Sequence, residues 1–392
     1  MAALPEGEPV PSSGALPPSA LTHVGAKGFG VYIHVPFCAS RCGYCDFNTY
    51  TPGELGGADI SSYLSAVERE LSLAASLVEP AAVDTVFFGG GTPTMLTSDQ
   101  LGRLLEAVDR TWGLAPGAEV TTEANPESVT PGSLKALHRN GFTRISLGMQ
   151  SASPGVLAIL DRKHTAGRAV AAVAESRDAG FKNINLDLIY GTPGESAEDF
   201  DESLDRATAS GADHISAYSL IVEDGTRLAA RVRRGELPPP DDDVAADRYL
   251  AAEARLSAAG FAWYEVSNWA LTAEARCRHN LLYWRGGDWW GFGPGAHSHI
   301  GGVRWWNVKH PKDYGSRLVE GRSPGLGREI LTPAQRRDEE VLLGIRLAEG
   351  LPLDDIDPGR VPEGLLRTAD GRATLTLRGR LLADAVVRSL LI

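Results

Sequence analysis

Three cysteines lie close together near the start of the chain. Cys38, Cys42 and Cys45 stand in the stretch FCASRCGYCDF, and the next cysteine is Cys277. A tetrahedral zinc site needs four ligands and a disulfide needs two thiols. A [4Fe-4S] cluster takes one thiolate per iron, so three cysteines would leave its fourth iron open to another molecule. The C-x3-C-x2-C spacing therefore predicts a cluster with one open coordination position.

A zinc site is the alternative interpretation of these cysteines. His34 or a distant residue could supply the fourth ligand. Zinc sites, however, usually combine C-x2-C pairs with each other or with histidines. Four cysteines in 392 residues are too few for a secreted disulfide framework, which indicates a reducing compartment where thiols stay free. We therefore favour a cluster over a zinc-stabilised binding module.

A glycine run follows the second apolar segment of the chain. In FFGGGTPTML, Gly89, Gly90 and Gly91 precede Thr92. Glycines let a backbone approach a ligand without obstruction by a Cβ atom, although such a run also occurs in simple tight turns. The segment lacks the GxGxxG spacing of a dinucleotide site and the GK[ST] of a phosphate loop. Both of these nucleotide-binding motifs are therefore excluded.

Short apolar runs alternate with amphipathic helical segments from residue 31 onward. We expect strands at 31–35, 83–88, 119–124, 144–149, 183–190 and 214–220. Six strands separated by helices predict parallel pairing, in either an open doubly wound sheet or a barrel. Both folds place their chemistry at the carboxyl ends of the strands. The unusual residues lie in these strands or just after them: Cys38, the glycine run, Glu123, Gln150, Asp187 and Tyr218.

The composition changes along the chain and predicts four regions. Residues 1–28 are rich in Pro, Gly, Ala and Ser and read as a disordered lead-in to a barrel at 29–225. A Pro- and Asp-rich linker and a helix at 243–259 then open an aromatic-rich extension at 226–325, which we expect to cover the barrel. Seven of the eight tryptophans lie in that extension. Residues 326–392 predict a small helical, winged-helix-like domain.

The net charge of −12 argues against a nucleic-acid partner, which would need a clustered basic face. The first thirty residues have no basic segment followed by an apolar one, and no later stretch has the apolar length of a membrane span. We therefore expect a cytoplasmic protein that is not transmembrane.

Taken together, YIHVPFCASRCGYCDF and the later GGGTPT resemble the radical S-adenosylmethionine (SAM) superfamily. The chain is most similar to the branch that contains oxygen-independent coproporphyrinogen III oxidase and the HemW-type haem chaperones. The resemblance runs from about residue 29 through nearly the whole chain. It implies an α/β fold with a partial (β/α)6 barrel and a C-terminal α+β, winged-helix-like domain. It also implies that SAM binds the open iron of the cluster through its amino and carboxylate groups.

The site residues of the superfamily can be carried over by position. Cys38, Cys42 and Cys45 match the cluster ligands. Glu123, in a Glu-x-x-Pro motif, would receive the SAM ammonium group, and Arg162 would pair with the SAM carboxylate. The remaining matches are Tyr32 and Tyr44 near the cluster and adenine, Gly90, Gly91 and Thr92 at the methionyl end, and Gln150 and Asp187 at the nucleoside.

Two local features separate the oxidases from the chaperones. The oxidase pattern has a fourth cysteine where this chain has Phe47, whereas the chaperone pattern has CDF, as here. The chaperones also carry an H-N-x-x-Y-W motif, and residues 279–284 read HNLLYW. In that motif, His279 would bind haem iron, Asn280 would fix the local turn, and Tyr283 and Trp284 would provide flat aromatic walls. Three other residues compete as the iron ligand: His297, His299 and Cys277.

The resemblance thus implies a haem chaperone that binds a [4Fe-4S] cluster, SAM and haem as cargo. It would deliver haem to acceptor proteins, which we expect to be respiratory enzymes at the membrane. The protein would then also bind peripherally at the inner membrane face. A homodimer is a further expectation. The alternative is a true enzyme, an oxygen-independent coproporphyrinogen III oxidase that forms protoporphyrinogen IX. Whether SAM is cleaved reductively stays open.

Overall fold

The computed structural model describes residues 7–80, 82–163, 165 and 167–391. Six parallel strands form its central sheet, each paired with the next along the chain. They are β2 (Phe29–Val35), β3 (Val83–Gly90), β4 (Leu114–Ala124), β5 (Arg144–Gln150), β6 (Asn183–Tyr190) and β7 (His214–Ser219). The six predicted strands are therefore confirmed. Among the described residues β2 and β7 do not pair with each other, so the barrel is partial, as expected.

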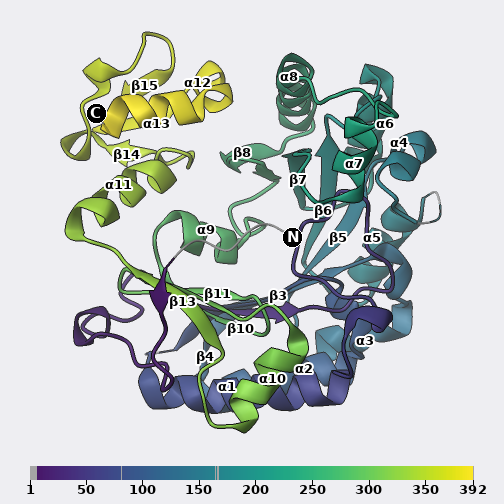
Figure 1. Cartoon of the computed structure of the whole chain (residues 1–392). Helices are drawn as coiled ribbons and strands as arrows, with labels where there is room; N and C mark the ends of the chain where they lie inside the picture. The colour runs from purple at the N-terminus through teal and green to yellow at the C-terminus, as the bar shows by residue number, and fades with distance from the viewer. Residues whose placement is uncertain (1–6, 81, 164, 166, 392) are drawn as a thin grey trace.

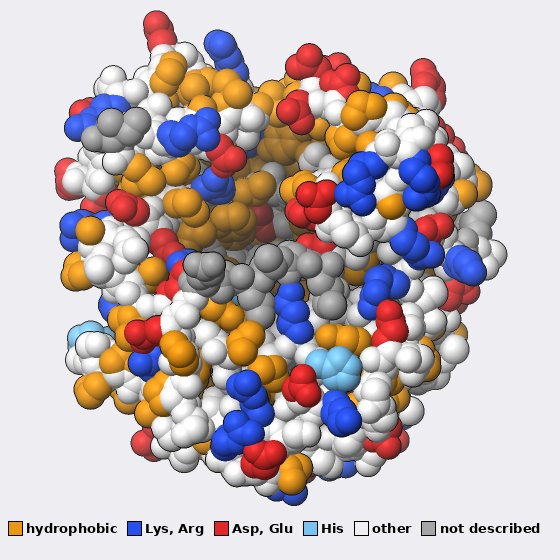
Figure 2. Space-filling view, in the orientation of Figure 1, with side chains coloured by type: hydrophobic (Ala, Val, Ile, Leu, Met, Phe, Trp, Pro, Cys, Tyr) orange, Lys and Arg blue, Asp and Glu red, His pale blue; other side chains and the backbone are white. Residues whose placement is uncertain are grey.

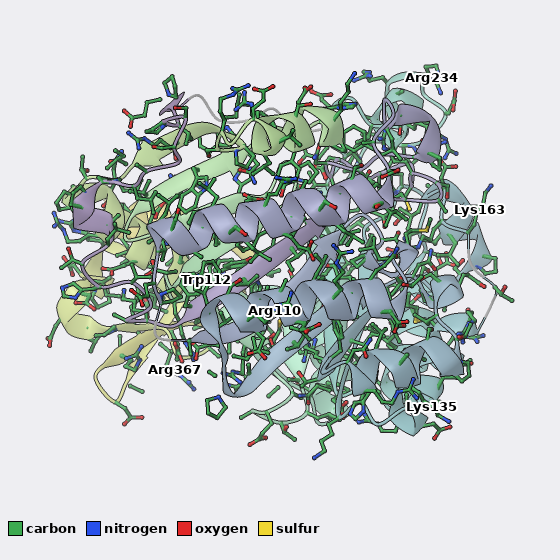
Figure 3. All side chains as sticks on the ribbon, turned by 90° about the horizontal axis from the view of Figure 1, so that it is seen from below. Arg110, Trp112, Lys135, Lys163, Arg234 and Arg367 are labelled. Atoms are coloured by element: carbon green, nitrogen blue, oxygen red, sulfur yellow. The ribbon has the colours of Figure 1, made fainter. Side chains whose placement is uncertain are left out.

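Helices connect these strands and cover the outer face of the sheet (Figure 1). They are α1 (Ile60–Leu77), α2 (Ser98–Trp112), α3 (Pro131–Arg139), α4 (Pro154–Ile159), α5 (Arg168–Asp178) and α6 (Ala197–Ala209). Figure 3, seen from below, shows α1 and α2 side by side, with Trp112 at the end of α2. The Trp112 ring meets Phe29 of β2 edge to face, with ring centroids 5.3 Å apart. Apolar contacts of this kind lie on the outer face of the sheet. The polar side chains described below lie on its inner face.

Further strands extend the sheet at both edges. Beyond β7 lie β9 (Asn268–Ala270) and β8 (Ala262–Glu265), and β10 (Asp288–Phe292) pairs in parallel with β2. Antiparallel strands follow β10: β11 (His297–Ile300), β12 (Val303–Asn307) and β13 (Gly325–Ile330). The accompanying helices are α7 (Arg227–Arg233), α8 (Asp242–Ala258), α9 (Arg278–Trp284) and α10 (Pro311–Val319). The predicted helix at 243–259 corresponds to α8.

The C-terminal elements form a small α+β unit, and its winged-helix-like character stays a prediction. Its helices are α11 (Pro333–Gly344), α12 (Leu377–Leu381) and α13 (Ala383–Leu391). Its antiparallel strands, in the order β14–β16–β15, are β14 (Leu351–Pro352), β16 (Arg372–Leu375) and β15 (Leu366–Ala369). Arg380 joins this unit to α8 through a 2.7 Å ion pair with Glu253. Figure 2 shows a hollow lined by apolar side chains between this unit and α8.

The expected disorder of the lead-in is wrong for residues 7–28. There β1 (Glu8–Pro9) pairs with β13, and Glu8 forms a 2.7 Å ion pair with Arg328. Gly25 N also donates to the Asp288 carboxylate at 2.9 Å. The composition of the segment does not indicate this order, because the contacts join it to strands far along the chain. Residues 1–6 lie outside the described residues, and the division into four regions stays a prediction.

Candidate functional site

The cysteine loop after β2 holds three free thiols close together. Cys38 is buried, and Cys42 and Cys45 are half-buried. Burial raises the pKa of Cys38 and raises the pKa of Cys45 to about 11, and the neighbouring thiols add to both shifts. Because only the thiolate binds metal, bound iron would be needed to keep these sulfurs ionised near neutral pH.

The chemistry of the loop is that of a cluster site, with three thiols and a nearby cation. Within the described ranges, no three His, Cys, Asp or Glu side chains converge closely enough to hold one metal ion. In a cubane cluster each thiolate binds its own iron, so the sulfurs need not converge on a point. Arg162 Nη1 lies 3.5 Å from Cys42 Sγ, where a cation would offset the negative charge of the thiolates. The residues present therefore fit a [4Fe-4S] cluster.

Gly91, in the loop after β3, packs directly against the cysteine loop. A Cβ atom at Gly91 would lie 2.6 Å from the Phe37 carbonyl oxygen and 3.1 Å from Cys38 Sγ. Gly91 N donates to Val35 O at 2.8 Å, and Thr92 N donates to Phe37 O at 2.8 Å. The glycine run thus brings the backbone of one loop against the other, and its approach to a ligand stays a prediction.

Distant parts of the chain also hold the cysteine loop. Gly43 N donates to Leu160 O at 3.0 Å, beyond α4, and Gly43 O accepts from Leu228 N of α7 at 2.9 Å. The Asn48 side chain donates to Pro294 O at 2.9 Å and to Lys309 O at 2.8 Å. The loop is therefore fixed by both the barrel and the sheet extension.

Two half-buried carboxylates, Glu123 and Asp187, face the inside of the barrel. Burial, with the nearby charge of Asp187, raises the pKa of Glu123 to about 8. Burial also raises the pKa of Asp187, although hydrogen bonds from Ser146 at 2.8 Å and Asn185 at 2.7 Å oppose this shift. Gly90 N donates to Glu123 at 3.2 Å. Two acids this close favour a cation between them, such as an ammonium group.

These carboxylates border a cavity of about 170 Å³. Its lining comes from the inner faces of several strands and from α9: Tyr32, Phe87, Glu123, Arg144, Ser146, Asn185, Asp187, His214, Ser216, Tyr218, Cys277, His279, Asn280 and Tyr283. Tyr32 and Phe87 lie opposite each other on β2 and β3, with their rings stacked at 6.3 Å. The cavity thus joins predicted SAM residues and the HNLLYW motif.

Arg162 and Gln150 come together at the end of β5. The Arg162 Nη2 atom donates to Gly148 O at 3.3 Å, while its Nε is buried with no hydrogen-bond partner in the described structure. A guanidinium with a buried, unused donor atom suits a carboxylate ligand. Gln150 has a positive φ of 67°, a strained conformation typical of functional sites. Tyr44, the remaining predicted SAM residue, packs half-buried against an apolar cluster of Val156, Leu160, Ile189, Leu220 and Leu228.

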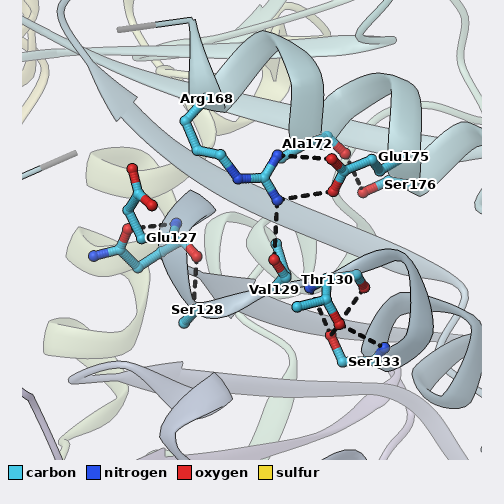
Figure 4. Close-up of polar contacts among 10 residues, drawn as sticks. Glu127, Ser128, Val129, Thr130, Ser133, Arg168, Ala172, Glu175 and Ser176 are labelled. Carbon is cyan, nitrogen blue, oxygen red and sulfur yellow. Dashed lines mark hydrogen bonds and ion pairs between the residues drawn. The ribbon is translucent and has the colours of Figure 1, made fainter. Parts of the chain in front are cut away.

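The segment after Glu123 is anchored to the helices that follow it. Thr130 caps α3 by accepting from Ser133 N at 3.2 Å. Arg168 of α5 donates to Val129 O at 2.9 Å and binds both oxygens of Glu175 (Figure 4). Because the guanidinium is held on both sides, it ties this loop to α5.

The HNLLYW motif forms α9 and lies against the inner face of the barrel. His279 is 1% exposed, with Nδ1 2.8 Å from Thr85 Oγ1 and Nε2 2.7 Å from the Tyr283 hydroxyl. Burial lowers the pKa of His279 to about 3, so the ring is neutral. Asn280 and Trp284 face the buried Glu265 carboxylate and oppose the rise in its pKa that burial causes. In this arrangement the four motif residues hold α9 in place, and their binding of haem stays a prediction.

The competing haem ligands lie in three different settings. Cys277 is buried, with its Sγ 3.7 Å from a Glu119 oxygen. His299 is half-buried and its Nδ1 donates to Gly287 O at 3.0 Å. His297 is exposed at the start of β11, and its ring stacks on Trp306 with centroids 5.9 Å apart. Of these three, His297 is the most accessible.

Several functional residues were not predicted. Glu119 caps α9 by accepting from Arg278 N at 3.1 Å and His279 N at 3.0 Å. His214 bridges Asn185 at 2.6 Å and the Tyr264 hydroxyl at 2.7 Å. The signal that could have identified them is polar residues at every second position of the central strands, which indicates one polar face of a buried sheet.

Comparisons with known proteins agree with this geometry. Residues 32–207 match the Radical SAM superfamily. The chain is 55% identical to the heme chaperone HemW of Mycobacterium tuberculosis, over 93% of this chain and 95% of that protein. It is 33% identical to the heme chaperone HemW of Bacillus subtilis, over 91% and 97%. Coproporphyrinogen III oxidase (HemN) from Escherichia coli, a radical SAM enzyme, has a TM-score of 0.81 at 23% identity, over 94% and 91% of the chains, which shows a shared fold. The chain therefore belongs to the HemW family of the radical SAM superfamily.

Proposed function

We propose that this chain is a haem chaperone, which binds haem and passes it to acceptor proteins. The observation that carries the proposal is the 55% identity to a heme chaperone across 93% of the chain. Phe47 supports it, because the oxidase pattern has a cysteine at that position. The likeness to the oxidase structure is one of fold and does not favour its activity.

The chaperone would carry a [4Fe-4S] cluster and SAM. Cys38, Cys42 and Cys45 would hold the cluster, which supplies one-electron chemistry when bound. Arg162 would pair with the SAM carboxylate through its unused Nε, and Glu123 would accept hydrogen bonds from the SAM amino group. In this protein both groups would act in folding, in oligomer control or in the regulation of haem transfer.

A transfer assay tests the proposal. The anaerobically reconstituted protein is loaded with haem and mixed with a haem-free acceptor, and the haem spectra of both proteins are followed. We expect haem to move to the acceptor. The same preparation, incubated anaerobically with coproporphyrinogen III, SAM and a reductant, should form no protoporphyrinogen IX. Product formation in that assay would instead establish the oxidase.

Phe47 offers a matched pair of variants for the same assay. Phe47→Cys recreates the oxidase pattern, whereas Phe47→Leu changes the side chain without adding a thiol. If the missing cysteine distinguishes the two activities, only Phe47→Cys can gain oxidase turnover. Haem transfer by Phe47→Leu then shows whether the aromatic ring itself matters.

We propose a cytoplasmic location with contact to membrane respiratory enzymes as acceptors. In the part of the chain that the structure describes, no helix is long and apolar enough to cross a membrane. Size-exclusion chromatography with and without haem tests for the expected homodimer. Co-purification with haem-containing respiratory complexes tests the acceptor class, and an absence of such complexes would count against it.

A further inference from the structure

The Asp187 carboxylate, which we predict to contact the SAM nucleoside, is held at both of its oxygens. Asn185 Nδ2 donates to Oδ1 at 2.7 Å, and Ser146 Oγ donates to Oδ2 at 2.8 Å. Asn185 Nδ2 also donates to Ser146 Oγ at 2.7 Å. A carboxylate can accept about four hydrogen bonds, so lone pairs of Asp187 remain for the hydroxyl groups of a ligand in the 170 Å³ cavity that it borders.

The groups that hold Asp187 form a row across the central sheet. Asn185 of β6 lies opposite Ser146 of β5 on one side and opposite His214 of β7 on the other. Asp187 is two residues beyond Asn185 and therefore lies on the same face. His214 Nδ1 is 2.6 Å from Asn185 Oδ1, so the row continues from the carboxylate into the histidine.

The two ends of this hydrogen-bond chain fix the direction of every bond in it. Ionised Asp187 can only accept, so Asn185 turns its amide nitrogen to the carboxylate and its oxygen to His214. His214 then donates from Nδ1, and its Nε2 accepts from the Tyr264 hydroxyl at 2.7 Å. At the far end the Cys277 backbone N–H can only donate, and it donates to that hydroxyl at 3.1 Å. Both ends therefore require the same neutral tautomer of His214.

His214 has no polar atom left for a ligand. It is 1% exposed, and both ring nitrogens are bonded within the protein. Burial, with the positive charge of Arg144, lowers the pKa of His214 well below its usual value, so the ring is neutral. Any polar effect of His214 on a ligand beside Asp187 must therefore pass through Asn185.

The orientation of the Asn185 amide decides which group Asp187 meets. The two ends of the amide have nearly the same shape, and a half turn would place its oxygen against the carboxylate. His214 opposes that turn by donating to the amide oxygen at 2.6 Å, and Ser216 Oγ donates to the same oxygen at 3.2 Å. The histidine thus keeps a donor rather than an acceptor facing Asp187.

We propose that His214 is a positioning residue for SAM, which acts through Asn185 on the Asp187 carboxylate. That carboxylate would accept hydrogen bonds from the hydroxyl groups of the nucleoside. This inference rests on the proposed binding of SAM and deepens it. Its consequence is that SAM affinity depends on a histidine whose polar atoms do not touch SAM.

Two matched variants of His214 test this role. The amide nitrogen of asparagine lies close to the position of histidine Nδ1, and that of glutamine lies close to Nε2. His214→Asn should therefore keep the donor to Asn185 and lose the Tyr264 contact, whereas His214→Gln should do the reverse. Each variant loses one buried hydrogen bond, so urea titrations should show similar losses of stability.

SAM binding is measured on the anaerobically reconstituted full chain. Equilibrium dialysis gives the affinity, and the change that SAM causes in the electron paramagnetic resonance spectrum of the reduced cluster gives a second readout. Iron and sulfide contents show whether the cluster is retained. We expect His214→Gln to weaken SAM binding about three- to tenfold, the effect of losing part of a charged hydrogen bond, and His214→Asn to stay within about twofold of the wild type.

A double variant tests the route through the carboxylate. In an Asp187→Asn background, His214→Gln should cause no further loss of SAM affinity, because residues that act through one group are not additive. An additive loss would overturn the inference, as would equal SAM affinities of His214→Asn and His214→Gln.

The remaining outcomes separate this inference from the function on which it rests. Should either His214 variant fail to fold, Asn185→Ala interrupts the same link one residue nearer to Asp187, and unchanged SAM affinity in that variant would also overturn the inference. If the wild-type chain carries a full cluster but binds no SAM, the proposed SAM binding itself fails.

Discussion

Substituting Gly91 by alanine should reduce cluster uptake while leaving the fold intact. The added Cβ would lie 2.6 Å from Phe37 O, 3.0 Å from Val35 O and 3.1 Å from Cys38 Sγ. Gly91 has no positive φ, so alanine fits its backbone conformation and the effect comes from contact alone. The atoms that it meets are mostly backbone and cannot rotate away. The two loops must therefore separate by several tenths of an ångström, which moves Cys38.

Overpacking of this kind costs about 1–3 kcal/mol. If the cost falls on the loop geometry that binds iron, cluster affinity should drop about 5- to 150-fold. The assay measures iron and sulfide per chain after anaerobic reconstitution at limiting iron, with circular dichroism to confirm folding. Gly53→Ala is the matched control, because a Cβ there meets no atom within 4 Å. A Gly91→Ala protein with a full cluster at limiting iron would refute this reasoning.

Three further predictions address SAM, the thiols and a buried acid. Arg162→Gln should keep the cluster but weaken SAM binding at least about tenfold, because a charged hydrogen bond contributes about 1.5–3 kcal/mol; unchanged SAM titration would contradict this. Iron uptake at limiting iron should rise from pH 7 to 9, since the Cys45 thiolate fraction grows as pH approaches its pKa of about 11; a flat profile would exclude the thiols as the limiting step. Burial raises the pKa of Glu70 from 4.5 to about 7, so folding favours its neutral form. The ionisation of Glu70 alone should therefore lower the unfolding free energy by about 3 kcal/mol from pH 4 to pH 8. Glu70→Gln should lack this pH dependence of the unfolding free energy, measured by urea titrations at several pH values. An unchanged pH dependence in the variant would be evidence against a raised pKa of Glu70.

The central sheet could be predicted because its strands are buried on both faces. Apolar residues recur at every second position of most of these strands, as in Phe29–Val35, where six of seven residues are buried. The extension strands could not be predicted in the same way. His297–Ile300 has four residues, HSHI, and its pairing partners rather than its own composition make it a strand. β1 is shorter still, with only Glu8 and Pro9.

The features of the site that depend on local sequence could also be predicted, whereas those that depend on contacts between distant residues could not. The three cysteines and the glycine run are local patterns, and the structure brings them together as expected. The burial of His279 could not be predicted, because its partner Thr85 lies 194 residues away. The motif indicated the aromatic neighbours of this histidine, but the hydroxyl groups at its two nitrogens depend on how α9 meets β3. Similarly, nothing local to Glu119 indicates that it caps a helix formed much later in the chain.

The anchoring of the cysteine loop sets an order of events during synthesis. The loop emerges early from the ribosome, but Asn48 finds its partner at Lys309 only 261 residues later. At about 5–20 residues per second, that interval lasts roughly 13–50 s. Throughout this time the three thiols are made but lack their final support. Stable insertion of the cluster should therefore follow completion of the sheet extension, and the nascent chain would need protection of its thiols from oxidation until then.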